Sequence, residues 1–283
     1  MKKIIALAVA GAFVSPVVFA EAEVGFSGEM EFQYVSSDGA TADALNNFAS
    51  EFNITATEEL DNGMTIKATL QFSGDGTDAG NADTDGGTLG VSGAFGSISL
   101  GDNAGALDSI DSVTAIAPAR DGSDLALGDD AGIAYVSPTV SGFTAMYSVS
   151  PSSSTTSTTA DFSSYAVKYS MDGITVGVGK DELAAGDDTV VAVSYSFGDA
   201  YFAYGVGEDS SANDISSIAA SYGMGALKLG VQKDETQDST GATTADETHV
   251  FVQYNLGGAK LYLEQKSDDF ADDTTIAGVE YKF

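Results

Sequence analysis

The chain has 283 residues, of which 43% are hydrophobic and 19% charged, with abundant glycine and no cysteine or tryptophan. Its formal net charge of −31 argues against nucleic acid as a partner, because phosphate binding requires clustered lysine and arginine. The lack of cysteine rules out a disulfide framework, so burial and backbone pairing must supply the stability.

Residues 1–20 have the pattern of a secretory signal peptide. Lys2 and Lys3 precede an apolar run that ends at Ala20, directly before the acidic Glu21. The alternative, a transmembrane anchor, is disfavoured because a Ser-Pro pair interrupts the run and no stop-transfer sequence follows it. We therefore predict an exported protein that is cleaved after Ala20.

From residue 23 onward, apolar and polar side chains alternate with a period of two, as they do in β-strands. Val191 and Val193, for example, alternate with Ala192 and Ser194. We predict sixteen strands, which span 23–36, 47–60, 64–74, 87–92, 97–102, 132–140, 143–150, 162–171, 174–181, 188–198, 200–208, 214–223, 226–235, 247–257, 259–267 and 273–283.

The connections between these strands alternate between tight and long. Asp172-Gly173 is typical of a tight hairpin turn, whereas 74–87 and 234–247 are long, polar and acidic. An even number of strands with short turns at one end and long loops at the other is the arrangement of an outer-membrane barrel. We therefore predict an all-β fold, a transmembrane antiparallel up-and-down β-barrel that occupies 21–283. A secreted β-sandwich is the alternative.

In such a barrel the apolar parity faces lipid and the polar parity faces a lumen. Aromatic residues of the apolar parity cluster near both ends of the strands, which indicates two interfacial belts. They are Tyr169, Tyr195, Phe197, Tyr222, Tyr254, Tyr281 and Phe283 near the short turns, and Phe48, Phe72 and Tyr147 near the long loops. A barrel has no free edge, so we expect the strand that contains Phe283 to pair with the first strand.

The segment TLGVSGAFGSISLGDNAGALDS (88–109) and the aromatic pair Tyr281 and Phe283 carry a family resemblance. With the strand pattern, they resemble the general diffusion porins of the Gram-negative outer membrane, most of all the alphaproteobacterial type. The resemblance implies a homotrimer in outer-membrane lipid that passes ions and small hydrophilic solutes. It also implies a third loop folded inward, at about 103–131, and a C-terminal signal for the assembly machinery.

The predicted constriction loop carries Asp108, Asp111, Arg120, Asp121 and Asp124. Porins of this family commonly set loop acids against a basic cluster on the wall, and this sequence departs from that pattern because its one arginine lies on the loop. By parity, the predicted pore-wall residues are Glu29, Glu31, Glu51, Lys67, Lys168 and Lys260. These carboxylates predict modest cation selectivity, although each could instead decorate the rim.

Other functions have less support in the sequence. The acidic segment 74–87 suggests calcium but lacks the spacing of an EF-hand, so we assign no metal or cofactor. We expect no enzyme, because His249 is the one histidine and no G-x-S-x-G motif is present. A solute-specific channel and a non-transport surface barrel or adhesin remain alternatives. Sugar-specific barrels usually line their path with stacked aromatics, and the inward aromatics of this chain are few and not evidently aligned, which disfavours the former: Tyr201, Phe251 and Tyr262.

Overall fold

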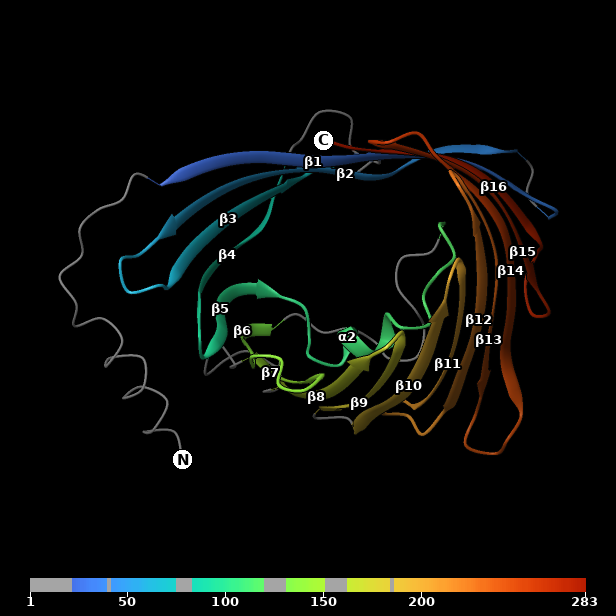
Figure 1. Cartoon of the computed structure of the whole chain (residues 1–283). Coiled ribbons are helices and arrows are strands. Elements are labelled where there is room, and N and C mark those ends of the chain that lie inside the picture. The colour runs from blue at the N-terminus through green and yellow to red at the C-terminus, as the bar shows by residue number, and fades with distance from the viewer. Residues whose placement is uncertain (1–21, 40–41, 75–82, 120–130, 151–161, 184–185) are drawn as a thin grey trace.

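The computed structural model describes residues 22–39, 42–74, 83–119, 131–150, 162–183 and 186–283. The predicted signal peptide and most of the acidic segment 74–87 therefore lie outside the described residues. Sixteen antiparallel strands close into one barrel, in which every strand pairs with its neighbours in sequence and the first pairs with the last (Figure 1). The predicted fold class and strand number are confirmed.

The strands are β1 (Glu23–Ser37), β2 (Ala44–Glu59), β3 (Thr65–Ser73), β4 (Asp83–Gly93), β5 (Gly96–Asn103), β6 (Ala131–Val136), β7 (Phe143–Ser150), β8 (Phe162–Met171), β9 (Ile174–Glu182), β10 (Asp187–Phe197), β11 (Ala200–Glu208), β12 (Asp214–Met224), β13 (Leu227–Gln237), β14 (Thr243–Asn255), β15 (Ala259–Asp268) and β16 (Thr274–Lys282). One short helix, α2 (Asp108–Asp111), lies between β5 and β6. No helix among the described residues is long and apolar enough to cross a membrane.

Short turns join the strands at one end of the barrel. The β8–β9 turn shows why the local sequence suits this end. Asp172 and Gly173 both have positive φ, at 53° and 83°, which is the backbone of a type I′ hairpin turn that favours Asp-Gly. At the opposite end the connections are longer, so the predicted alternation of tight turns and long loops matches the strand bounds.

The side chains alternate between the two faces of the barrel wall as the sequence pattern predicts. On β10 the valines 191 and 193 are exposed on the outside, whereas Val190 and Ala192 are buried inside. The apolar face thus points away from the barrel, which is the reverse of a soluble sheet packed on a core.

Three strands differ most from the predicted bounds. β4 begins at Asp83 instead of 87, and β14 begins at Thr243 instead of 247, because each ladder continues past an irregularity in its register. β6 ends at Val136 instead of 140, because the next residues include Pro138, which has no N–H to donate, and only the isolated bridge between Val140 and Phe143 follows before the turn at Ser141 and Gly142. Backbone pairing thus extends some strands beyond the residues that alternate in sequence.

The seam between β1 and β16 closes the barrel. The amide of Gly28 donates to the Phe283 carbonyl at 2.9 Å, and the Phe283 amide donates back to the Gly28 carbonyl at 3.0 Å. The Phe283 ring covers Gly28 so closely that a Cβ at this position would lie 2.5 Å from it. Tyr281 stacks on the same ring, with centroids 5.8 Å apart, and both aromatic side chains are about half exposed on the outer face.

Candidate functional site

The third long connection turns into the lumen instead of extending from the end of the barrel. We call it loop L3, which comprises residues 104–130, of which 104–119 are described. Figure 1 shows α2 and the chain on either side of it within the ring of strands. An inward third loop is what the sequence analysis predicts, and its position divides the lumen into two unlike parts.

On one side, L3 packs against small residues of the wall. Leu107 and Ile110 are completely buried. They lie over Gly177 and Gly179 of β9, where a Cβ would come within 2.5 Å of the Ile110 and Leu107 side chains respectively. Ala166, Val190, Ala192, Ala203, Ile215 and Ala219 complete this apolar cluster. Because the wall residues are small, a helix fits inside the barrel at close packing.

Wall hydroxyl groups anchor the start of L3. The amide of Ala106 donates to Ser148 Oγ at 2.8 Å, and the amide of Leu107 donates to Ser164 Oγ at 2.9 Å. These amides precede a helix and have no hydrogen-bond acceptor within it, so the two serine hydroxyl oxygens serve as their acceptors. The Tyr201 hydroxyl donates to the backbone carbonyl of Val113, just after α2, at 2.5 Å.

Amide and carboxylate groups of the opposite wall hold the part of L3 that follows. Gln232 Oε1 on β13 accepts from the amides of Ile116 and Ala117 at 2.9 and 3.2 Å. Glu264 Oε2 on β15 accepts from the amide of Ala119 at 3.0 Å. Gln232 and Glu264 are both fully buried, so each bond is shielded from water. L3 therefore crosses the lumen from β7 and β8 to β15.

The single histidine belongs to the same wall network. His249 Nδ1 lies 2.7 Å from Glu264 Oε1, and its Nε2 lies 3.4 Å from Glu247 Oε2. Lys266 in turn donates to Glu247 at 2.7 Å. His249 thus holds one carboxylate oxygen of Glu264 while the other accepts from L3, so the histidine has a structural role here.

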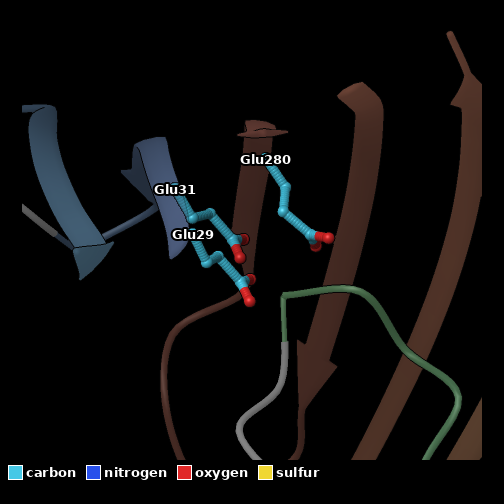
Figure 2. Close-up of side chains that lie close together, drawn as sticks. All are labelled: Glu29, Glu31 and Glu280. Carbon is cyan, nitrogen blue, oxygen red and sulfur yellow. The ribbon is translucent and has the colours of Figure 1, made fainter. Parts of the chain in front are cut away.

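On its other side, L3 borders a cavity of about 610 Å³. Residues 115–118 of the loop face β1, β2 and β16 across it, and the charged side chains that line it are Glu29, Glu31, Glu51, Lys260 and Glu280. Figure 2 shows Glu29 and Glu31 from β1 beside Glu280 from β16, with carboxylates close together inside the barrel. Carboxylates thus form most of the charged lining of this cavity.

Lysines offset part of this negative charge. Glu29, Glu31 and Glu280 each place a carboxylate oxygen within 4.8 Å of the others, which makes them, among the described residues, the acidic group compact enough to hold a cation. Lys282 Nζ lies 2.9 Å from Glu29 and 3.3 Å from Glu280, and Lys260 also pairs with Glu280. Because two ammonium groups already contact the cluster, it needs no resident metal ion.

Glu31 is held in place by its neighbours. The Tyr262 hydroxyl donates to its carboxylate, and Gln33 Nε2 donates to it at 3.3 Å. Only 4% of Glu31 is exposed, so these bonds supply part of the solvation that a buried charge loses. The ring of Tyr262 lies over Gly278, which leaves the space that the ring needs.

The structure brings some predicted site residues together and separates others. Glu29, Glu31, Glu51 and Lys260 line the cavity beside L3. Lys67 and Lys168 lie elsewhere, on β3 and β8. Asp108 and Asp111 lie on α2, whereas Arg120, Asp121 and Asp124 fall outside the described residues. Tyr281 and Phe283 lie on the outer face.

The sequence analysis did not select Glu280, Gln232 or Glu264. Glu280 shares the inward parity of Lys282, so alternation alone could have placed it on the wall. That Glu280 lies beside Glu31 becomes evident only from the β1–β16 register, in which these two residues are opposite each other. No sequence pattern identifies Gln232 and Glu264 as partners of L3.

The sequence matches the family described as Gram-negative porin over residues 6–283. Among solved structures, a variant of Rhodopseudomonas blastica porin with five substitutions is 18% identical, with a TM-score of 0.78 over 92% of this chain and 100% of that chain. Another variant, with three substitutions, is 16% identical, with a TM-score of 0.79 over the same shares. A search of curated proteins finds no match. At these identities the structural likeness concerns the fold.

Proposed function

Because the chain belongs to the Gram-negative porin family, we propose that it forms a water-filled channel through which ions and small hydrophilic solutes diffuse passively. The family and the sixteen-stranded fold are those of outer-membrane channels, not of enzymes. Barrels of this size enclose an aqueous lumen, and diffusion through one requires no catalysis.

We propose that the channel has a modest preference for cations. The observation that carries this proposal is the cavity beside L3, whose charged lining is mostly carboxylate. Glu29, Glu51 and Glu280 face this space with Lys260, and Lys282 contacts the cluster. Residual negative charge in a narrow, partly dehydrated passage raises the local cation concentration and opposes the entry of anions.

The inward aromatics support a general channel over a solute-specific one. The rings of Phe251 and Tyr262 are 3% and 5% exposed, because they pack over Gly230 and Gly278. Tyr201 packs against the apolar cluster under L3. A sugar-specific path needs aromatic faces open to the solute, whereas two of these rings are covered and the third is partly buried.

The assembly and export of the protein are also proposals. We propose a homotrimer that the outer-membrane assembly machinery inserts after residues 1–20 are removed. Tyr281 and Phe283, stacked on the outer face beside the seam, are the side chains that the machinery would recognise. Their exposure is consistent with recognition and with contact to interfacial lipid.

Planar-bilayer conductance of the detergent-extracted protein tests the channel proposal. With a KCl gradient across the bilayer, we expect stepwise insertions in three equal levels and a reversal potential that favours K⁺. A reversal potential that favours Cl⁻ would retain the channel and overturn the role of the carboxylates. Folded protein that does not conduct would overturn the channel and favour the surface-barrel or adhesin alternative.

Substitutions of Glu29 on β1 and Glu51 on β2, with an outward residue of β2 as the control, test the carboxylates directly. Glu51 faces the cavity, whereas Glu58 on the same strand has the opposite, outward parity. We expect Glu51→Gln combined with Glu29→Gln to lower the K⁺/Cl⁻ permeability ratio about two-fold, the size expected for removing charges in a high dielectric. Glu58→Gln should leave the ratio unchanged. An equal effect of Glu58→Gln would show that position in the lumen is irrelevant.

A further inference from the structure

The inward-facing lysines are unevenly distributed along the barrel axis. Five of them lie near the strand ends that meet the short turns, and we call them the lysine collar: Lys67 on β3, Lys168 on β8, Lys228 on β13, Lys260 on β15 and Lys282 on β16. Each shares its parity with polar or buried lumen residues. Lys168, for instance, has the parity of Ser164 and Ala166, which are 0% and 3% exposed.

Three members of the collar keep their charge available to the lumen. Lys260 and Lys282 pair with Glu280 and Glu29. Within the part of the chain that the structure describes, Lys67, Lys168 and Lys228 form no ion pair. Lys228 Nζ lies 5.7 Å from the centroid of the Phe251 ring, whose position inside the barrel fixes the direction of the lysine.

The opposite end of the lumen has the opposite charge. Near the long loops, the inward-facing carboxylates are Asp181, Asp188, Asp234, Glu247 and Asp268. The lysine described among them, Lys266, is paired with Glu247 at 2.7 Å. Lys180 and Lys233 are also near this end, but they lie on the outer face and pair with Asp187 and Asp246.

The short-turn end also carries carboxylates, in two settings. Glu29, Glu31 and Glu280 lie inside the lumen beside Lys260 and Lys282 and offset their charge, so the positive charge of the collar rests on Lys67, Lys168 and Lys228. The others lie on turns and strand ends, in contact with bulk water: Glu23, Glu59, Asp61, Asp172 and Asp199. Charges in open water at a rim are screened within about 10 Å at 0.1 M salt. The lysine collar lies inside the lumen, where ions must pass close to it.

From this placement we propose that the acidic long-loop end and the lysine collar act as two unlike filters in series and make the channel rectify. The inference rests on the proposed channel function and extends it, because a uniformly acidic lumen would conduct equally in both directions. Here the long-loop end favours cations, while the three collar lysines without an ion pair, Lys67, Lys168 and Lys228, weaken that preference at the short-turn end.

The direction of rectification follows from the order of the filters. When the long-loop side is positive, cations enter through the end that favours them and anions enter past the lysine collar. Both ions then accumulate inside the lumen, and the conductance rises. With the opposite voltage each ion leaves through the end that favours it, so the lumen is depleted and the conductance falls. We therefore expect the larger current when the long-loop side is positive.

Current–voltage curves from channels of known orientation test the proposal. The chain has no cysteine, so Ala271→Cys, on the exposed β15–β16 loop, provides one attachment point for a bulky thiol reagent that identifies the long-loop side. In symmetric KCl at about 0.1 M, we expect currents at opposite voltages to differ about 1.5-fold, because the Debye length then covers much of the lumen. At about 1 M the ratio should approach one.

A matched pair on β13 assigns the effect to the lysine collar. Lys228 faces the lumen, and Lys233 on the same strand faces outward. We expect Lys228→Gln to reduce the current ratio and the triple change with Lys67→Gln and Lys168→Gln to reduce it further, while Lys233→Gln leaves it unchanged. Conducting channels with symmetric curves, or equal effects of Lys228→Gln and Lys233→Gln, would overturn rectification alone. A protein that does not conduct would overturn the proposed function instead.

Discussion

The wall formed by β8 to β12 and the wall formed by β13 to β16, β1 and β2 face the same lumen with different side chains. The first is lined by glycine, alanine and serine, such as Gly177, Ala192 and Ser164, and L3 packs on it as on a protein core. The second carries long charged and amide side chains, such as Glu31 and Gln232, which hydrogen-bond to one another and to L3.

This difference shows how one strand pattern serves two purposes. Both walls alternate with period two, and both place apolar residues outside. The inward positions alone decide whether the lumen holds protein or water. Small inward residues allow a loop to pack closely on one wall, and long polar residues of the other wall hydrogen-bond to that loop and border the cavity beside it.

The largest expected effect comes from removing the apolar contact on the first wall. Leu107→Ala with Ile110→Ala should weaken the attachment of L3 by about 2–5 kcal/mol for each side chain, because both are completely buried. We expect a higher single-channel conductance and a barrel that remains folded by its strand pairing. Leu263→Ala, on the outer face of β15, is the control. Unchanged conductance in the double variant would show that L3 does not limit the current.

On the second wall, a smaller effect should follow from Gln232→Ala. The Gln232 side chain accepts from the amides of Ile116 and Ala117, and a buried amide without a partner costs about 1–3 kcal/mol. We expect faster hydrogen exchange at these two amides and noisier open-channel current. Gln253→Ala, at a residue that borders the cavity beside L3, should change neither. Protected amides in the Gln232 variant would contradict the role of this anchor.

The smallest expected effect concerns the loops above the two walls, which should behave alike. Asp238 above the second wall accepts from Thr240 and from the Ala242 amide, and these bonds lower the pKa of its carboxyl below 3.8. For Asp209 above the first wall, burial raises the pKa, but hydrogen bonds from Asn213 and the Ser211 amide outweigh burial and lower it.

Because both pKa values are lowered by folding, each carboxylate stabilises its loop above the ordinary pKa, and this stabilisation is lost as the pH falls through the folded pKa. Hydrogen exchange of the loop amides, followed from about pH 5 to about pH 2, measures the loss. Asp238→Asn keeps an acceptor without the titration, so its loop should not respond to pH. A response in one loop and not in the other would extend the difference between the walls to the loops.

The sequence predicts the lumen wall better than the contacts within it. Period-two alternation is a local property, so it assigns Glu29, Glu31 and Glu51 to one face before any pairing is known. That Glu280 joins them depends on the register in which β1 meets β16, which is set by closure of the whole barrel.

The period-two alternation does not predict where L3 packs, for a related reason. Residues 104–119 do not alternate, and their partners come from strands spread over more than a hundred residues of sequence. One indication was present, since Gly177, Gly179, Ala192 and Ala203 are small residues of inward parity on three successive strands. Such a run marks a wall against which something else must pack.

The seam at Gly28 and Phe283 also constrains the order in which the barrel forms. These two residues exchange hydrogen bonds although they lie at opposite ends of the described sequence, so their contact has the greatest chain separation in the fold. Every other pair of neighbouring strands can form a hairpin from local sequence, whereas this pair must wait for all the strands between them. Loop-closure entropy therefore makes the seam the slowest pairing to nucleate. Until it forms, β1 and β16 are open edges that can pair with other chains.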